Sequence, residues 1–492
     1  MPASPRPAGI EAWFPGMAQA AAGESGFRLL PDGIGAFVAR AWLARMATRT
    51  LDLQYYLINA DDTGRLLAGE VLAAADRGVR VRILLDDIYT LRTNRPIAIL
   101  DSHPQIEIRL FNPWARRRGR IARAVGFLLE AARLNHRMHN KLFVADEHAV
   151  IIGGRNIGNE YFDLDPRMNF RDLDVLAVGP VAAGAAGSFD EYWDSAWAVP
   201  AAALVGAAPV PADLDALRAR LAAHRASLRD SAYVRALADS AIAAQFAARN
   251  LALEYGVARV IADSPAKVGS AGGGREDWLV ERLRRQAREA RHELLVSSPY
   301  FVPRAGGVAA LTALARDGAA VSVLTNSLAA SDVGLVHGSY GRYRPALLRG
   351  GVRLFELRRT AGLAARRRER RKFGSENVSL HAKYLVIDRE SLFVGSLNLD
   401  PRSIDRNTEI GLLIESAPLA QQAAALFGLA SSPAFSYAVS LRDGAPGRSD
   451  ALTWQGERDG RVLGYDHEPD TAWWQRSLAR IVGSLPFMES QV

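Results

Sequence analysis

Apolar, β-branched segments alternate with helical segments along the chain, and the same order occurs twice. The first half is expected to contain strands at 51–58, 79–87 and 106–111, with a helix at 62–76. The second half is expected to contain strands at 293–302, 319–326 and 351–357, with a helix ending at 316. Strands that alternate with helices form right-handed parallel crossovers. The pattern predicts an α/β protein with two similar halves, each a mostly parallel mixed sheet flanked by helices.

Two polar motifs lie at matching places in the halves, HNKLFVAD at 139–146 and HAKYLVID at 381–388. They carry the same residues at the same spacing: His139, Lys141 and Asp146, then His381, Lys383 and Asp388. A second apolar strand and a glycine turn follow each motif and lead to Asn156 or Asn398, 17 residues after the histidine. One polar pattern repeated in both halves predicts a single site built from both.

The lysines indicate what this site binds. Lys occurs at only four positions, 141, 267, 372 and 383, among 61 basic residues, and two of the four belong to the motifs. An ammonium group is a compact charge that fits against a phosphate where a planar guanidinium does not. We therefore expect a phosphate site.

Composition limits the class of protein. A chain of 492 residues with 49% hydrophobic and 23% charged residues suits two globular domains. We predict a first domain at 24–200, a helical connecting segment at 201–255, a second domain at 256–430 and a C-terminal extension with an amphipathic helix at 431–492. The absence of Cys excludes disulfides and thiolate metal sites. The net charge of +8 favours nucleic acid or an acidic lipid surface as partner.

The chain shows no membrane-spanning or secretory segment in its pattern. The N-terminal residues lack a basic region followed by an apolar core. The longest uncharged apolar stretch, 196–212, is interrupted by Pro200, Pro209 and Pro211. We expect a soluble or surface-bound protein.

The repeated order and motifs resemble the phospholipase D superfamily. Within it, the chain is similar to bacterial cardiolipin synthases of the two-motif type that lack N-terminal membrane helices. The narrower likeness is carried by RLNHRMHNK (133–141), NSLAASDVGLVHGSYGRYRPALL (326–348) and GSLNLDPRSIDRNTEIGL (395–412). The resemblance implies halves related by a pseudo-two-fold axis, with one active site at their interface.

Displacing an alcohol from a phosphodiester requires a nucleophile, a proton donor for the leaving oxygen and cations on the non-bridging oxygens. Two histidines can divide the first two tasks. Lys141, Lys383, Asn156 and Asn398 can perform the third, and neither a metal nor a cofactor is expected. The resemblance implies a phosphohistidine intermediate, with attack by His139 and acid–base work by His381.

Carboxylates are expected to orient the imidazoles. Asp146 and Asp388 complete the motifs and belong to the catalytic set, although the resemblance makes them largely structural. Asp172 and Glu409 occupy matching places after each Asn, so each histidine is expected to have its own acid. Asp174 is the alternative to Asp172. Ser396, which replaces Gly154 of the first motif, can bond phosphate or cap a turn.

Other polar and aromatic residues have two interpretations. His136 and His337 can border the pocket or pack elsewhere. Aromatic residues at strand ends can line a substrate path, although core packing is the favoured interpretation; they are Tyr55, Tyr56, Tyr300 and Phe301.

Basic and amphipathic segments favour a lipid. An arginine cluster precedes each motif histidine, at 116–123 and at 366–371. Segments 121–134 and 471–487 are amphipathic, and the second carries Trp473 and Trp474, so each suits an anionic bilayer or docks on its own domain. We predict a peripheral enzyme of the bacterial inner membrane, on its cytoplasmic face. It would transfer a phosphatidyl group from phosphatidylethanolamine or phosphatidylglycerol to phosphatidylglycerol, giving cardiolipin.

Three alternatives stay open at this point. A phospholipid hydrolase would use the same site with water as acceptor. A nuclease of the superfamily would use the positive charge, but no aromatic–basic stripe appears, and no nucleic-acid partner is expected. A lipid-binding protein without activity would not need both motifs intact. No accessory protein is indicated by the sequence.

Overall fold

The computed structural model describes residues 9–90, 94–114, 130, 132–204, 209–269, 274–360, 375, 377–442, 451–458 and 460–484. The arginine clusters and most of the predicted amphipathic segment 121–134 lie outside these residues.

In the described part of the first half, the main sheet has eight strands in the order β9–β4–β3–β2–β5–β6–β8–β1. Their bounds are β1 (Ser25–Leu30), β2 (Thr50–Tyr55), β3 (Arg80–Asp86), β4 (Ile106–Phe111), β5 (Leu142–Ala145), β6 (Ala149–Gly153), β8 (Asp174–Val178) and β9 (Ala198–Pro200). The helices are α1 (Gly33–Met46), α2 (Asp62–Asp76), α3 (Asn94–Asp101) and α5 (Pro180–Trp193). Parallel pairing joins β2 to β3 and β3 to β4, where helices form the crossovers.

The second half repeats this arrangement with the order β10–β17–β16–β15–β11–β12–β13–β18. Its strands are β10 (Glu254–Ala262), β11 (Glu293–Ser297), β12 (Ala320–Asn326), β13 (Arg353–Leu357), β15 (Tyr384–Ile387), β16 (Ser391–Gly395), β17 (Ile410–Glu415) and β18 (Ser436–Leu441). Its helices are α10 (Leu279–Ala287), α11 (Arg304–Arg316), α12 (Gly334–Gly341), α13 (Arg344–Arg349), α15 (Pro401–Asp405) and α16 (Ala417–Ala430). The strand order is therefore the same as in the first half when each sheet is followed from β1 or from β10.

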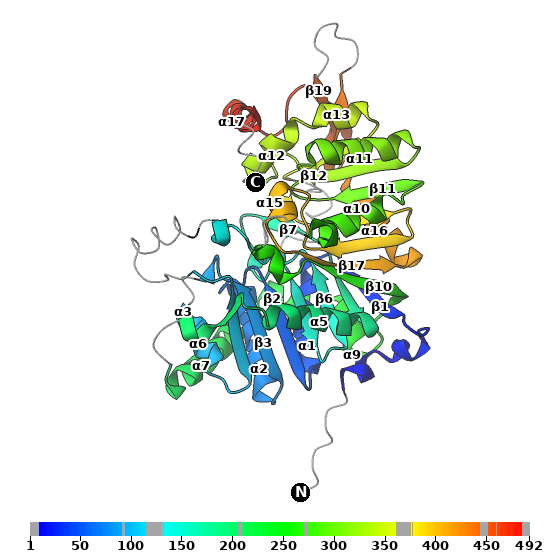
Figure 1. Cartoon of the computed structure of the whole chain (residues 1–492). Coiled ribbons are helices and arrows are strands. Elements are labelled where there is room, and N and C mark those ends of the chain that lie inside the picture. Colours follow the sequence, from blue (N-terminus) through cyan, green and yellow to red (C-terminus); the bar gives the residue numbers. More distant parts are fainter. Residues whose placement is uncertain are drawn as a thin grey trace.

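The halves join through β1 and β10, which pair antiparallel with Gly26 opposite Tyr255. Among the described residues, one 18-stranded sheet results, and β19 (Leu452–Arg458) and β20 (Arg461–Tyr465) extend its outer edge. Figure 1 shows the first half below and the second half above. The predicted α/β fold of two similar halves with mixed sheets is confirmed. Among the described residues of the main sheet, parallel pairing is limited to three strands per half, because tight hairpins connect the motif strands.

The interface between the halves is a common hydrophobic core. Phe189 of α5 and Phe427 of α16 belong to one buried cluster, together with Val144 of β5 and Val386 of β15. Burial of apolar surface is the main stabilising term in folding. Each motif strand therefore rests on a core to which both halves contribute.

The connecting segment packs on the first half. It contains α6 (Ala201–Leu204), α7 (Pro211–Leu228), α8 (Ala232–Ala238) and α9 (Ala241–Ala247). Phe246 stacks on Trp42 of α1 with ring centroids 5.6 Å apart. The segment is not one continuous helix: α7 ends at Leu228, and the Ser231 hydroxyl caps α8 by accepting from the Val234 amide.

The C-terminal part ends in α17 (Trp473–Ser484), which packs on α12 at the upper left of Figure 1. Throughout the part of the chain that the structure describes, every helix is too short or too polar to cross a membrane.

Candidate active site

The residues just before β5, where the first motif begins, lie against residues of the second half. Met138 forms a parallel bridge with Thr408, and the His139 amide donates to the Thr408 carbonyl at 2.9 Å. Asp86, the last residue of β3, accepts from the Met138 amide at 2.9 Å. Burial raises the pKa of Asp86 to about 6. These contacts fix the backbone of His139 against the segment that carries Glu409.

The second motif is held in the same manner. β14 (Val378–Leu380) pairs parallel with β7 (Asn169–Arg171), and the His381 amide donates to the Arg171 carbonyl at 2.6 Å. Asn326, the last residue of β12, accepts from the Leu380 amide at 2.7 Å and donates to its carbonyl at 3.0 Å. Thus β7 brings Asp172 to His381.

The carboxylates are exchanged between the halves. His139 Nδ1–H donates to both oxygens of Glu409 at 3.0 Å, and His381 Nδ1–H donates to Asp172 Oδ2 at 2.5 Å. Each histidine has its own acid, but that acid belongs to the other half. The sequence did not indicate this exchange; it results from the parallel pairings that cross the interface. With Nδ1 engaged in this way, Nε2 of each ring is left for chemistry.

Asp174, the alternative acid, lies elsewhere. Its carboxylate pairs with Arg40 at 2.9 Å and with Arg155 at 3.3 Å, and all three side chains are buried. The alternative is therefore wrong, because Asp174 is committed to an ion pair inside the first half.

Ser396 and Gly154 make the two acid sites different. The Ser396 hydroxyl donates to Glu409 Oε2 at 2.5 Å and accepts from the Ile410 amide at 3.0 Å. A Cβ at Gly154 would lie 2.3 Å from Asp172 Oδ1. Ser396 therefore positions Glu409, whereas Gly154 leaves room for Asp172.

The two lysines lie beside the histidines. Lys141 Nζ donates to the His139 carbonyl at 2.6 Å, and Lys383 Nζ donates to the His381 carbonyl. Burial lowers the pKa of Lys141 to about 7 and that of Lys383 to about 8. Lys383 also lowers the pKa of Lys141, which indicates that the two ammonium groups share one site. An anion between them would offset both the burial and the repulsion.

Both imidazoles favour the neutral form. Burial lowers the pKa of His139 to about 4, against the opposite effect of Glu409. Burial and the neighbouring Lys383, Lys141 and His139 lower the pKa of His381 well below its usual value. A phosphate anion at this site would raise both pKa values. The protonation of the two imidazoles thus depends on whether an anion is bound between them.

The amides of Asn156 and Asn398 are buried after the glycine turns. Asn156 Nδ2 donates to the Tyr161 hydroxyl at 2.9 Å, and Oδ1 of each Asn has no hydrogen bond to the described residues. Tyr161 thereby orients one of the two amides.

Asp146 and Asp388 lie at the far ends of the motif strands from the histidines. The intervening strands have four residues and span about 13 Å. Each Asp opens a tight hairpin turn, with φ of 53° at Asp146 and 54° at Asp388. Asp146 accepts from the amides of Thr48, Arg49 and Thr50, and Asp388 from those of Arg291, His292 and Glu293. These positions give both residues a structural role.

Aromatic rings border the imidazoles. Tyr56 lies edge-on to His139 at 5.1 Å between ring centroids, and Tyr161 lies edge-on to His381 at 5.2 Å. Phe170 lies 4.8 Å from His381. The core interpretation of Tyr56 missed its contact with His139, and neither Tyr161 nor Phe170 was identified from the sequence. Their only signal is their place in the loop between Asn156 and Asp172.

The remaining candidates make other contacts. Tyr55 and Phe301 are core residues. Tyr300 donates to Asp332 at 2.7 Å. His136 contacts the Arg406 carbonyl at 2.9 Å, and His337 contacts Glu468 at 3.1 Å. Within the described ranges, no three His, Asp or Glu side chains are grouped as metal ligands.

Comparisons with known proteins agree with this geometry. The family described as "Cardiolipin synthase, PLD-like domain" matches residues 43–193 and 283–429. Cardiolipin synthase C of Escherichia coli (strain K12) is 39% identical over 94% of this chain and 96% of its own length. Cardiolipin synthase A of Pseudomonas syringae pv. syringae (strain B728a) is 27% identical over 80% of this chain and 66% of its own length.

One solved structure covers nearly the whole chain. The crystal structure of phosphatidylserine synthase from Haemophilus influenzae Rd KW20 covers 95% of each chain with a TM-score of 0.60 and 13% identity, a likeness of fold. The family match accounts for the duplicated motifs and for the paired halves. The resemblance drawn from the sequence is confirmed: the chain belongs to the phospholipase D-like cardiolipin synthase family.

Proposed function

We propose that this enzyme makes cardiolipin by phosphatidyl transfer, through a phosphohistidine on His139. The observation that carries the proposal is the pair of crossed contacts, His139 with Glu409 and His381 with Asp172, beside two buried lysines. This arrangement supplies the nucleophile, the proton donor and the cations that phosphodiester exchange requires.

In the first step, Nε2 of His139 attacks phosphorus and forms an N–P bond. The bond from phosphorus to the leaving alcohol breaks, and His381 gives the Nε2 proton of its imidazolium to the departing oxygen. Lys141 and Lys383 hold the non-bridging oxygens, with help from the amides of Asn156 and Asn398.

In the second step, the hydroxyl of the acceptor lipid attacks phosphorus. Neutral His381 takes the hydroxyl proton, the new O–P bond forms, and the N–P bond to His139 breaks. His381 ends as an imidazolium and His139 as a neutral imidazole, which restores the starting state. Water in place of the lipid would yield phosphatidic acid.

The difference between the acids supports His139 as the nucleophile. Burial raises the pKa of Glu409, but His139, Lys141 and the Ser396 hydroxyl outweigh burial and lower it. Burial raises the pKa of Asp172, despite Lys383. A phosphorylated imidazole that keeps its Nδ1 proton is cationic, so it is best stabilised by the carboxylate whose pKa is lowered. That carboxylate is Glu409.

The acceptor we propose is phosphatidylglycerol, and the donor is phosphatidylethanolamine or phosphatidylglycerol. The names of the related synthases and the net charge of +8 support anionic lipid substrates. We place the enzyme at the surface of the bacterial inner membrane, on its cytoplasmic side.

Lipid products test this proposal. Purified protein is incubated with mixed micelles of phosphatidylethanolamine and isotope-labelled phosphatidylglycerol, and the lipids are identified by mass spectrometry. Label in cardiolipin, absent with a His139→Ala variant, is the expected result. Phosphatidic acid as the sole product would assign the chain to the hydrolases instead.

A further inference from the structure

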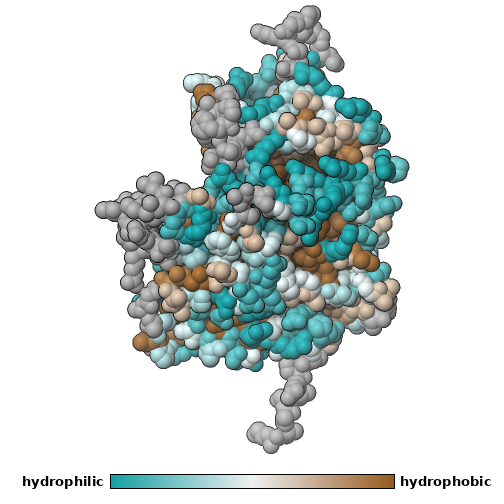
Figure 2. All heavy atoms as spheres, viewed as in Figure 1, coloured by the Kyte–Doolittle hydropathy of each residue, from teal (hydrophilic) through white to brown (hydrophobic). Residues whose placement is uncertain are grey.

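The C-terminal helix α17 presents an apolar face to solvent. Trp473, Trp474, Leu478 and Ile481 are 73%, 55%, 52% and 60% exposed. At about 100° per residue, these four side chains fall within an arc of about 140° on the helix. Among the described residues, the other exposed large apolar side chains lie outside α17; they are Tyr89, Val210, Val257, Leu335, Leu429 and Val462. Apolar atoms are visible in Figure 2 where Figure 1 shows α17.

The opposite face of α17 is already docked. Ala479 is buried, and a Cβ at Gly338 of α12 would lie 2.5 Å from the Ala479 carbonyl oxygen. A Cβ at Gly483 would lie 2.4 Å from the Gly338 carbonyl oxygen. The two helices therefore meet backbone to backbone through small residues. The exposed face is thus held outward, and the docking interpretation accounts for only half of the helix.

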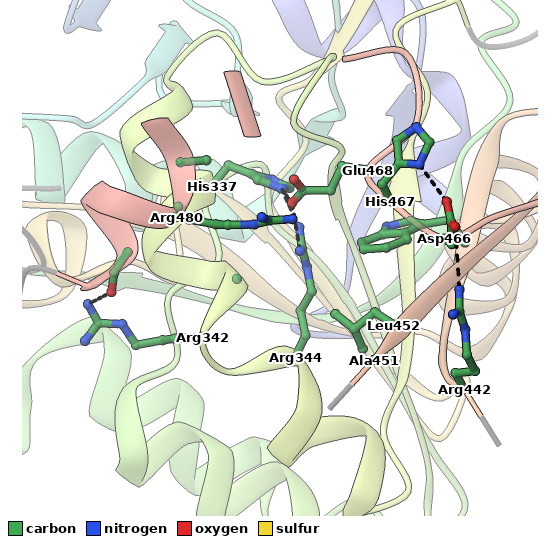
Figure 3. A pocket seen from close by; sticks show the side chains of 15 residues that line it. His337, Arg342, Arg344, Arg442, Ala451, Leu452, Asp466, His467, Glu468 and Arg480 are labelled. Atoms are coloured by element: carbon green, nitrogen blue, oxygen red, sulfur yellow. Dashed lines mark hydrogen bonds and ion pairs between the residues drawn. The ribbon is translucent and has the colours of Figure 1, made fainter. Parts of the chain in front are cut away.

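Positive charge flanks the exposed face. Arg476 and Arg480 lie on one edge of the apolar arc, and α17 contains no acidic residue. Arg480 also lines a cavity of about 690 Å³ between α17, α12 and the last strands. Figure 3 shows Arg342, Arg442 and Arg480 in this cavity, and Arg442 pairs there with Asp466 at 4.0 Å, which leaves Arg480 as the cavity arginine that α17 itself contributes. An apolar face with a basic edge is the pattern of a helix that lies in the interface of an anionic membrane.

One segment of the second half, just before and within α12, lies next to both α17 and the active site. α17 packs on α12, and Asp332 lies just before α12. Asp332 accepts from Tyr300, and its charge raises the pKa of Lys383. The exposed helix and the phosphate site are therefore adjacent to the same segment of the second half.

We infer that α17 is the membrane-docking element of this enzyme, and that its partner is an anionic phospholipid bilayer. Trp473, Trp474, Leu478 and Ile481 enter the interfacial layer, and the flanking arginines contact lipid phosphates. The inference rests on the proposed lipid substrate, because it explains how an enzyme without a spanning helix among its described residues reaches lipids in a bilayer.

The test compares a Trp473→Ser/Trp474→Ser variant with a Leu429→Ser/Val462→Ser control. Leu429 and Val462 are 57% and 70% exposed on other elements, so the control removes two apolar side chains of similar fractional exposure outside α17. Co-sedimentation uses vesicles of phosphatidylcholine alone, or with one quarter phosphatidylglycerol. Activity is measured with vesicles and with detergent mixed micelles, which do not require docking on a bilayer. Thermal melting verifies folding, and Ile481→Glu serves as a second variant.

We expect the tryptophan variant to bind phosphatidylglycerol vesicles about tenfold more weakly than the control. Vesicle activity should fall in proportion, while micelle activity stays within about twofold. Unchanged vesicle binding would overturn the inference, as would a loss of activity in micelles equal to the loss with vesicles. Because sedimentation needs no turnover, wild-type protein that binds vesicles through α17 but forms no cardiolipin would refute the proposed function alone.

Discussion

His381 in the second half donates a hydrogen bond to Asp172 in the first half at 2.5 Å. Glu409 in the second half accepts in turn from His139 in the first half. Neither half contains a complete histidine–acid pair, although each carries a complete motif. The exchange makes the interface itself the active site, and it makes the two acids experimentally distinguishable.

Asp172→Asn should impair the proton donor. The variant loses the negative charge that stabilises the His381 imidazolium, and we expect kcat with lipid to fall about 10³-fold. A nitrophenyl phosphodiester needs little proton donation to its leaving group, so the rate of its first-turnover burst of nitrophenol should fall far less. The ratio of the two rates measures this selectivity.

Glu409→Gln is the matched comparison. It removes the negative charge beside the nucleophile His139, so the activity with lipid and the activity with the nitrophenyl substrate should fall to a similar extent. If each acid served the histidine of its own half, the two patterns would be reversed, with Glu409→Gln being the variant that spares the nitrophenyl substrate.

Ser396 and Gly154 occupy equivalent positions but should respond differently to alanine. Ser396→Ala removes one hydrogen bond to Glu409, and we expect about a tenfold loss of kcat. Gly154→Ala places a Cβ 2.3 Å from Asp172 Oδ1, so Asp172 must shift away from His381. A loss of 10²-fold or more is expected, about the size seen when an orienting carboxylate is displaced. Equal losses in both variants would contradict the different roles of these residues.

Acid should destabilise the fold through the buried histidines. The folded pKa of His139, about 4, lies below the unfolded value of 6.5. Its neutral form therefore contributes full stability above pH 6.5, and this contribution is lost as the pH falls toward 4. Denaturant unfolding across that window should show a loss about 3 kcal/mol smaller in His139→Gln than in wild type. Parallel profiles would indicate that the imidazole is not buried as a neutral group.

The motif aspartates should affect stability more than catalysis. Asp146→Ala leaves three backbone amides and the Thr48 hydroxyl without an acceptor, which costs about 3 kcal/mol. Asp388 is more exposed than Asp146, so Asp388→Ala should cost about half as much. Well below the melting temperature, kcat of both variants should stay within about threefold of wild type. A kcat loss comparable to that of a motif lysine variant would place these carboxylates in the chemistry.

Most of the fold could be predicted because it depends on local patterns. β4 has the predicted bounds, the strand predicted at 79–87 is one residue shorter at each end, and the strand predicted at 319–326 begins one residue later. The exchange of acids depends on β7, β14 and the bridge between Met138 and Thr408, which are three residues long or shorter. Such short pairings carry no periodicity in the sequence, so position after the Asn identified Asp172 and Glu409 but not their partners.

Two other site residues were overlooked for a related reason. Asp86 and Asn326 are the last residues of equivalent strands, and each accepts a hydrogen bond from the backbone amide just before a motif histidine. They nevertheless differ in residue type. Comparison of the halves by identity alone passes over this pair, whereas comparison by strand position finds it. The amide and the carboxylate perform the same task, since both accept from a backbone N–H.

In the proposed mechanism, His139 forms the covalent bond to phosphorus and His381 transfers the proton. A His381→Ala variant is incubated with the nitrophenyl phosphodiester, and the protein is digested and analysed by mass spectrometry. Because this leaving group departs without a proton donor and the adduct cannot be resolved efficiently, the phosphoryl adduct should accumulate on His139, and none should form in His139→Ala. An adduct on His381 in the His139→Ala variant, with none on His139 in the His381→Ala variant, would show that the roles of the two histidines are reversed.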